Sequence, residues 1–200
     1  MSTKAFMKGN EAIGEAAIRS GVMAYYGYPI TPQNELTAYM AKHMKEKGRV
    51  FIQTESEITA INAVFGSSCA GFRAMTSSAS TAMSLKQEGI SHIAYLEMPA
   101  VIVDMMRGGP GLGNILATQN DYNQAVKGGG TGDYHTIVLA PNSVQEAADL
   151  TRLAFELADK YRNPAMVLAD GTIGQMVEQV EFPEPIEPGD LPEKEYALTG

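Results

Sequence analysis

The sequence contains one cysteine, no tryptophan and only three histidines in 200 residues. A single thiol, Cys69, excludes an internal disulfide framework and cannot supply the several thiolates that hold an iron–sulfur cluster. The three histidines (His43, His92 and His135) lie far apart and form no His-x-x-x-His pair, so we predict no tightly bound metal. Any electron-transfer centre is therefore expected on another chain.

Positive charge and long apolar runs are also scarce. The chain has 15 Lys and Arg against 23 Asp and Glu, which gives a formal net charge of -8, and the basic residues are scattered. Nucleic-acid binding has no electrostatic basis here. No apolar run is long enough to span a membrane, and the first residues contain neither a long apolar region nor a small-residue cleavage site. We expect a cytoplasmic protein.

Short apolar runs rich in β-formers alternate with longer segments of helical periodicity. This alternation is typical of βα units that build a parallel sheet. We predict an α/β fold: a doubly wound, mostly parallel sheet of about six strands with helices on both faces. The predicted strands are residues 23–30, 50–54, 72–77, 100–106, 136–140 and 165–170. At 44% hydrophobic content, residues 1–180 are expected to form one domain.

Local signals also place the helix ends. Asn10 is predicted to cap a first helix that ends at Gly21, and Thr31 with Pro32 to open the next one. Ser143 and Glu146 have capping-box spacing, in a helix expected to end near residues 161–163. A further helix is predicted over residues 56–70. From Glu181 the sequence is rich in proline and acid, so we expect residues 181–200 to be a linker toward a further C-terminal domain.

Ligands of doubly wound sheets bind where the strands end, which directs attention to Thr31, Glu57, the Ser/Thr cluster of residues 76–81, and Arg107. Each also has a simple structural interpretation. Thr54 and Glu57 have capping-box spacing, Thr31 is a natural helix cap, and Arg107 lies three residues after Asp104. The RGGPGLGN segment matches neither a Walker loop nor a dinucleotide fingerprint.

Several longer segments, taken together, resemble one family. They are GYPITPQNE (27–35), TESEI (54–58), TSS…SLKQEGIS (76–91), MRGGPGLGN (106–114), QNDY (119–122), KGGGTGDYHTIVLAPNSVQEAADL (127–150) and YRNPAMVLADG (161–171). The chain resembles the alpha subunit of 2-oxoacid:ferredoxin oxidoreductases, most closely the 2-oxoisovalerate type, with the 2-oxoglutarate type next. The resemblance implies the pyrimidine-binding fold of thiamine enzymes and an active site shared between chains.

The resemblance also implies roles for individual residues. Glu57 matches the catalytic glutamate that contacts the aminopyrimidine ring of thiamine diphosphate, a role it places on Glu57 and not on Glu55. Thr31 and Arg107 match substrate-binding residues, since the planar fork of an arginine can bind a carboxylate bidentately. The remaining cofactor-binding candidates are Pro29, Ile30, Thr76, Ser77 and Ser78.

The implied reaction is oxidative decarboxylation of a 2-oxoacid to an acyl-coenzyme A, with electrons passed to ferredoxin. Thiamine diphosphate would be shared with a beta subunit, while magnesium and iron–sulfur clusters would be held by partner subunits only, among them gamma and ferredoxin-like delta subunits. One departure concerns residues 76–84, which read TSSASTAMS where many relatives have Gly-Pro-Gly. This change leaves open a pyruvate- or 2-oxoglutarate-type enzyme, or a non-catalytic scaffold subunit. An unrelated nucleotide-binding domain is a third interpretation.

Overall fold

The computed structural model describes residues 3–199 and contains a six-stranded sheet in which every neighbouring pair is parallel. The strand order is β3-β2-β4-β5-β7-β6. The strands are β2 (Ala24–Gly27), β3 (Val50–Gln53), β4 (Ala74–Ser78), β5 (Ala100–Met106), β6 (Ile137–Leu139) and β7 (Pro164–Asp170). Each lies within or beside a run predicted from the sequence, and the doubly wound fold class is confirmed.

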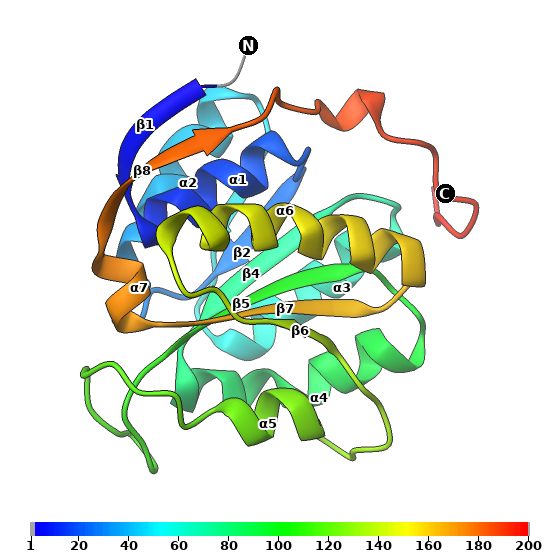
Figure 1. Ribbon diagram of the computed structural model, residues 1–200. Helices are drawn as coiled ribbons and strands as arrows, with labels where there is room; N and C mark the ends of the chain where they lie inside the picture. Colours follow the sequence, from blue (N-terminus) through cyan, green and yellow to red (C-terminus); the bar gives the residue numbers. More distant parts are fainter. Residues whose placement is uncertain (1–2, 200) are drawn as a thin grey trace.

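Helices cover both faces of this sheet (Figure 1). One face carries α1 (Gly9–Arg19), α2 (Asn34–Glu46) and α6 (Val144–Tyr161), and the other carries α3 (Glu57–Cys69), α4 (Ser80–Tyr95) and α5 (Tyr122–Lys127). Two separate apolar clusters fill the two interfaces, one around Tyr25 and Phe155 and the other around Ile61 and Ile90. Burial on both faces explains why the strands read as nearly continuous apolar runs.

The helix α6 follows its local signals closely. Ser143 caps it by accepting a hydrogen bond from the Glu146 amide at 3.0 Å, and the helix ends at Tyr161, before a left-handed Arg162. Gly21 likewise adopts a left-handed φ of 74°, two residues after α1 ends. These predictions are confirmed because both ends depend on neighbouring residues only.

Two predicted helix caps are wrong. Helix α1 begins at Gly9, so Asn10 lies inside its first turn, where its side-chain amide donates to the Pro32 carbonyl at 2.9 Å. Helix α2 begins only at Asn34, and the Thr31 carbonyl instead accepts from Arg107. The Asn10 side chain is thus held by a distant segment, whereas among the described residues the Thr31 hydroxyl accepts only from the nearby Asn34 side-chain amide, at 3.4 Å, and caps no helix.

A second, antiparallel sheet was not predicted. The strands β1 (Thr3–Lys8) and β8 (Val177–Phe182) form it, and β8 is reached through the short helix α7 (Gly171–Gln175). The domain boundary predicted between residues 180 and 181 therefore falls inside β8. Among the described residues, no helix has the length and apolar character needed to cross a membrane.

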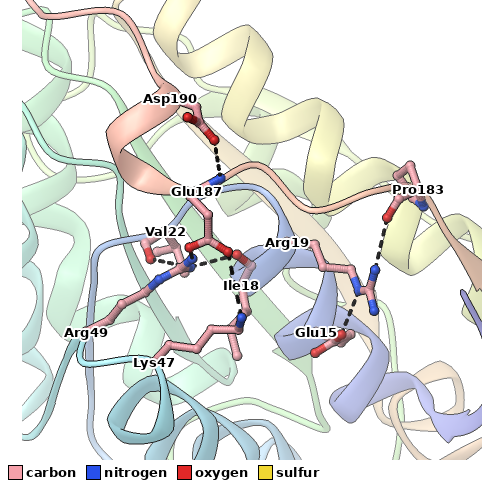
Figure 2. Close-up of polar contacts among 9 residues, drawn as sticks. All are labelled: Glu15, Ile18, Arg19, Val22, Lys47, Arg49, Pro183, Glu187 and Asp190. Carbon is pink, nitrogen blue, oxygen red and sulfur yellow. Dashed lines mark hydrogen bonds and ion pairs between the residues drawn. The ribbon is translucent and has the colours of Figure 1, made fainter. Parts of the chain in front are cut away.

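The chain after β8 returns along the body of the domain (Figure 1). The Ile186 amide donates to the Arg19 carbonyl at 2.7 Å, and the Leu198 amide to the Cys69 carbonyl at 2.8 Å. Figure 2 shows the central contact, in which Glu187 meets Arg49 and Lys47 beside a short 3₁₀ turn, η1 (Pro188–Asp190). Residues 183–199 are thus attached at several points, and a further domain beyond them stays a prediction.

Candidate functional site

The strand order reverses at β2, which has β3 on one side and β4 on the other. At such a switch point the connections after two neighbouring strands diverge and leave a crevice at their carboxyl ends. The segments that flank it here are the turn after β2, residues 28–33, and the end of β4. The candidate site is built from these two segments and from the ends of β3 and β5.

An open hollow of about 580 Å³ lies beside the turn after β2. It brings together Pro29, Ile30, Thr31 and Arg107, four of the residues selected from the sequence. Its other lining residues are Tyr28, Asn34, Thr37, Ala38, Ala41, Phe51 and Gln53. Glu57 and the Ser/Thr residues of β4 are not part of this lining.

Gln33 fixes the turn after β2 from inside. Its fully buried side chain donates to the Tyr28 carbonyl at 3.2 Å and accepts from the hydroxyls of Thr37, at 2.9 Å, and Ser77, at 2.5 Å. Ser77 also bonds to the Tyr25 hydroxyl at 2.5 Å. Ser77 therefore holds β2, β4 and the turn together, a structural role that the sequence did not indicate.

Glu57 is the first residue of α3 and is only 6% exposed. The predicted capping box is wrong: Ser56 caps the helix by accepting from the Thr59 amide, while the Thr54 hydroxyl donates to the Ser56 carbonyl. Within residues 3–199 no hydrogen bond to the Glu57 carboxylate is formed. The Glu57 carboxylate is therefore buried at a helix N-terminus and available to a ligand.

Lys86 faces this region from α4 and is fully buried. Its ammonium donates to the Thr76 hydroxyl at 2.5 Å. Burial lowers the pKa of Lys86 to about 7, against the opposing effect of the negative charges of Glu57 and Asp104. Lys86 was not among the residues predicted from the sequence, although it continues the apolar stripe of Met83, Ile90 and Ile93, where a lysine is out of place.

A buried polar cluster connects the start of α4 with the end of β5. The Ser80 amide donates to Asp104 at 3.2 Å, and the Ser80 hydroxyl bonds to the Arg107 carbonyl at 2.8 Å and to the Asp121 carboxylate. Burial raises the pKa of Asp104 well above its usual range, and the charge of Asp121 raises it further. Residues 80–84, the second half of the segment that departs from its relatives, form the start of α4.

The simple structural interpretation of Arg107 was an ion pair with Asp104, and this pair is not formed. One terminal nitrogen of its guanidinium donates to the Thr31 carbonyl and the other to the Leu112 carbonyl, each at 2.9 Å. Its Nε is buried without a hydrogen-bond partner among the described residues, as is the Ser78 hydroxyl. Arg107 therefore ties the turn after β2 to the glycine-rich loop and keeps further N–H donors unused.

The structure thus forms two groups from the predicted residues. One group, Thr31, Pro29, Ile30 and Arg107, lines the hollow. In the other, Thr76 contacts Lys86, whose charge interacts with Glu57. In the part of the chain that the structure describes, no group of three or more His, Cys, Asp or Glu side chains could hold a metal ion.

Comparison with known proteins gives a consistent result. A family model described as "Pyruvate flavodoxin/ferredoxin oxidoreductase, thiamine diP-bdg" matches residues 15–196. The chain is 58% identical over 178 residues to ketoisovalerate oxidoreductase subunit VorB of Methanothermobacter marburgensis, covering 89% of this chain and 51% of the relative. It is 44% identical over 183 residues to 2-oxoglutarate synthase subunit KorA of Methanocaldococcus jannaschii, covering 91% and 50%.

Among solved structures, the chain is similar to a 2-oxoglutarate:ferredoxin oxidoreductase from Magnetococcus marinus with 2-oxoglutarate, coenzyme A and succinyl-CoA bound. The TM-score is 0.85 at 34% identity, over 95% of this chain and 33% of that one. The chain spans about half the length of the curated relatives that it matches.

Proposed function

Since the chain belongs to the thiamine diphosphate-binding family of pyruvate flavodoxin/ferredoxin oxidoreductases, we propose that it is the part of an alpha subunit that holds the aminopyrimidine side of that cofactor. The whole enzyme is proposed to decarboxylate a 2-oxoacid oxidatively to an acyl-coenzyme A and to reduce ferredoxin. A branched-chain 2-oxoacid is favoured, because the ketoisovalerate relative is 58% identical and the 2-oxoglutarate relative 44%.

The buried, unbonded carboxylate of Glu57 is the observation that carries this proposal. The residue is 6% exposed and its carboxylate forms no hydrogen bond within residues 3–199, and the Ser78 hydroxyl is likewise buried without a partner there. Two unused polar groups beside the switch point fit the polar edge of a pyrimidine ring. When bound, thiamine diphosphate supplies the electron sink for decarboxylation. Glu57 would hold a proton at a ring nitrogen of the aminopyrimidine and so favour the tautomer that can accept a further proton.

Thr31 and Arg107 are proposed to bind the substrate from the hollow. Arg107 has five N–H donors, and the carbonyls of Thr31 and Leu112 engage one on each terminal nitrogen. The remaining donors, with the Thr31 hydroxyl, suit the carboxylate of a 2-oxoacid. The same two bonds fix the position of the guanidinium, so that little rotamer freedom is left to lose when the substrate binds.

The remaining parts of the reaction are assigned to partners. Beta, gamma and ferredoxin-like delta subunits are proposed to hold the diphosphate, magnesium and the iron–sulfur clusters, because this chain has a single cysteine. The subunit names of the relatives support an enzyme of several chains. Residues 181–200 are proposed to continue into the rest of the alpha subunit.

The test compares two neighbouring acids in the reconstituted complex. Glu57→Gln keeps the size of the side chain but removes the acid, so 2-oxoacid-dependent reduction of a viologen dye should fall by about 100-fold or more. Glu55→Gln is the matched control, since Glu55 is exposed and bonds only locally, to Thr59. Rates with 2-oxoisovalerate, 2-oxoglutarate and pyruvate rank the substrates. Unchanged turnover in Glu57→Gln refutes the role of Glu57, and a complex inactive with all three acids points to a scaffold subunit.

A further inference from the structure

Lys86 is a lysine at a position of α4 whose neighbours on the same face are apolar. It lies on the inner face of α4 with 0% exposure, between α3 and the sheet. An unpaired buried ammonium costs several kcal/mol in solvation, roughly, and a methionine of similar length would avoid that cost. A lysine in this position therefore needs a compensating partner nearby.

The groups that face Lys86 come from three other elements. Thr76 in the middle of β4 accepts a hydrogen bond from the ammonium at 2.5 Å, and the carboxylates of Glu57 on α3 and Asp104 on β5 attract it. Neither carboxylate forms a direct ion pair with Lys86 among the described residues, so the attraction acts across a gap. Asp121 interacts with Asp104, and its charge raises the pKa of Asp104.

These neighbours are not equivalent. Burial and the nearby Asp121 raise the pKa of Asp104 well above its usual range, which favours the neutral acid. Glu57 is then the carboxylate left to balance the ammonium. We propose that Lys86 is a positioning residue for the cofactor site, which balances the charge of Glu57 inside the protein and orients the hydroxyl of Thr76.

Two consequences follow for the chemistry of the site. The positive charge of Lys86 attracts the carboxylate of Glu57, the acid proposed to contact the aminopyrimidine ring. The Thr76 oxygen already accepts from Lys86, so its own hydroxyl proton is free to donate to a bound ring. Because burial lowers the pKa of Lys86 to about 7, the balance between the two charges changes close to neutral pH.

This inference rests on the proposed function, and the experiment separates the two. In the reconstituted complex, Lys86→Met and Lys86→Gln remove the charge, Lys86→Arg keeps it, and Lys42→Met is the control at an exposed lysine of α2. The acidic limb of the pH profile of kcat/KM for viologen reduction should move up by about 1 to 2 pH units in the neutral variants. In Lys86→Arg the acidic limb should lie at least part of the way back toward the wild-type position, and the profile of Lys42→Met should match that of the wild type.

A second measurement does not depend on turnover. Calorimetric titration of thiamine diphosphate into the cofactor-free complex, in buffers of different ionisation enthalpy, counts the protons exchanged on binding. The pH dependence of that count should shift in the neutral variants as the rate profile does. If the curves do not shift and only the rates fall, the proposed role of Lys86 is wrong. It is also wrong if both neutral variants fail to assemble while Lys86→Arg assembles, because the charge is then needed for folding and not for positioning Glu57. A wild-type complex inactive with every 2-oxoacid instead contradicts the proposed function.

Discussion

Arg49, immediately before β3, joins three distant parts of the chain and allows the contributions of its contacts to be separated. One terminal nitrogen of its guanidinium donates to the carbonyls of Ile18, at 2.7 Å, and Val22, at 3.0 Å, and the other donates to Glu187 at 2.6 Å (Figure 2). The Arg49 side chain is 3% exposed, whereas that of Glu187 is 53% exposed. The two carbonyls are buried and the carboxylate faces solvent.

We expect the buried contacts to dominate. Hydrogen bonds from a charged donor contribute about 1.5 to 3 kcal/mol each, and Arg49→Met removes two of them from carbonyls near the end of α1. Packing by the methionine and relief from burying the guanidinium offset part of this loss, so the free energy of unfolding should fall by about 3 kcal/mol. Glu187→Gln should lower it by at most about 1 kcal/mol, because solvent screens a half-exposed pair.

Urea unfolding followed by circular dichroism measures both changes in the 200-residue chain. Lys4→Met is the control, since Lys4 and Glu181 form an exposed ion pair at 3.4 Å, and its effect should stay within about 0.5 kcal/mol. If Glu187→Gln destabilised the chain as much as Arg49→Met, the ion pair would be the main contact of Arg49, and the dominance of the buried carbonyl contacts would be refuted.

Three further predictions concern stability and use the same unfolding measurement. Gly9→Ala should destabilise the chain by about 2 kcal/mol or more, because an added Cβ would lie 2.0 Å from the Ile173 carbonyl oxygen. Gly66→Ala, in open space within α3, should stabilise it by about 0.5 to 1 kcal/mol. Equal effects of the two substitutions would contradict the packing described for Gly9. Ser143→Ala should cost about 1 kcal/mol through loss of the α6 cap, and no loss would show that the cap is dispensable. Burial lowers the pKa of Lys86 from 10.5 to about 7, so the unfolded chain binds more protons between these values. Relative to Lys86→Met, wild-type stability should therefore rise with pH from about 7 to 10, by up to about 1.4 kcal/mol per pH unit, and parallel pH curves for the two proteins would refute this.

The candidate site could be predicted from the sequence only in part. Thr31 and Arg107 were selected because they follow strands, and the fold does bring them to one hollow. Their contact was not predictable, since the bond between the Thr31 carbonyl and Arg107 joins residues that are 76 positions apart. Lys86 was visible as a lysine on an apolar stripe, but its neighbours Glu57 and Asp104 belong to other elements.

The sequence by itself determined the six parallel strands, the cap and end of α6, and the left-handed Gly21, because backbone hydrogen bonding and apolar periodicity act over a few neighbouring residues. The tertiary structure decided which polar groups those elements bring together. It turned Asn10 away from a helix end toward Pro32, and it attached residues 183–199 to the domain through Arg49. It also buried Lys86 opposite Glu57, because the solvation and partners of a buried charge depend on elements that are distant in sequence.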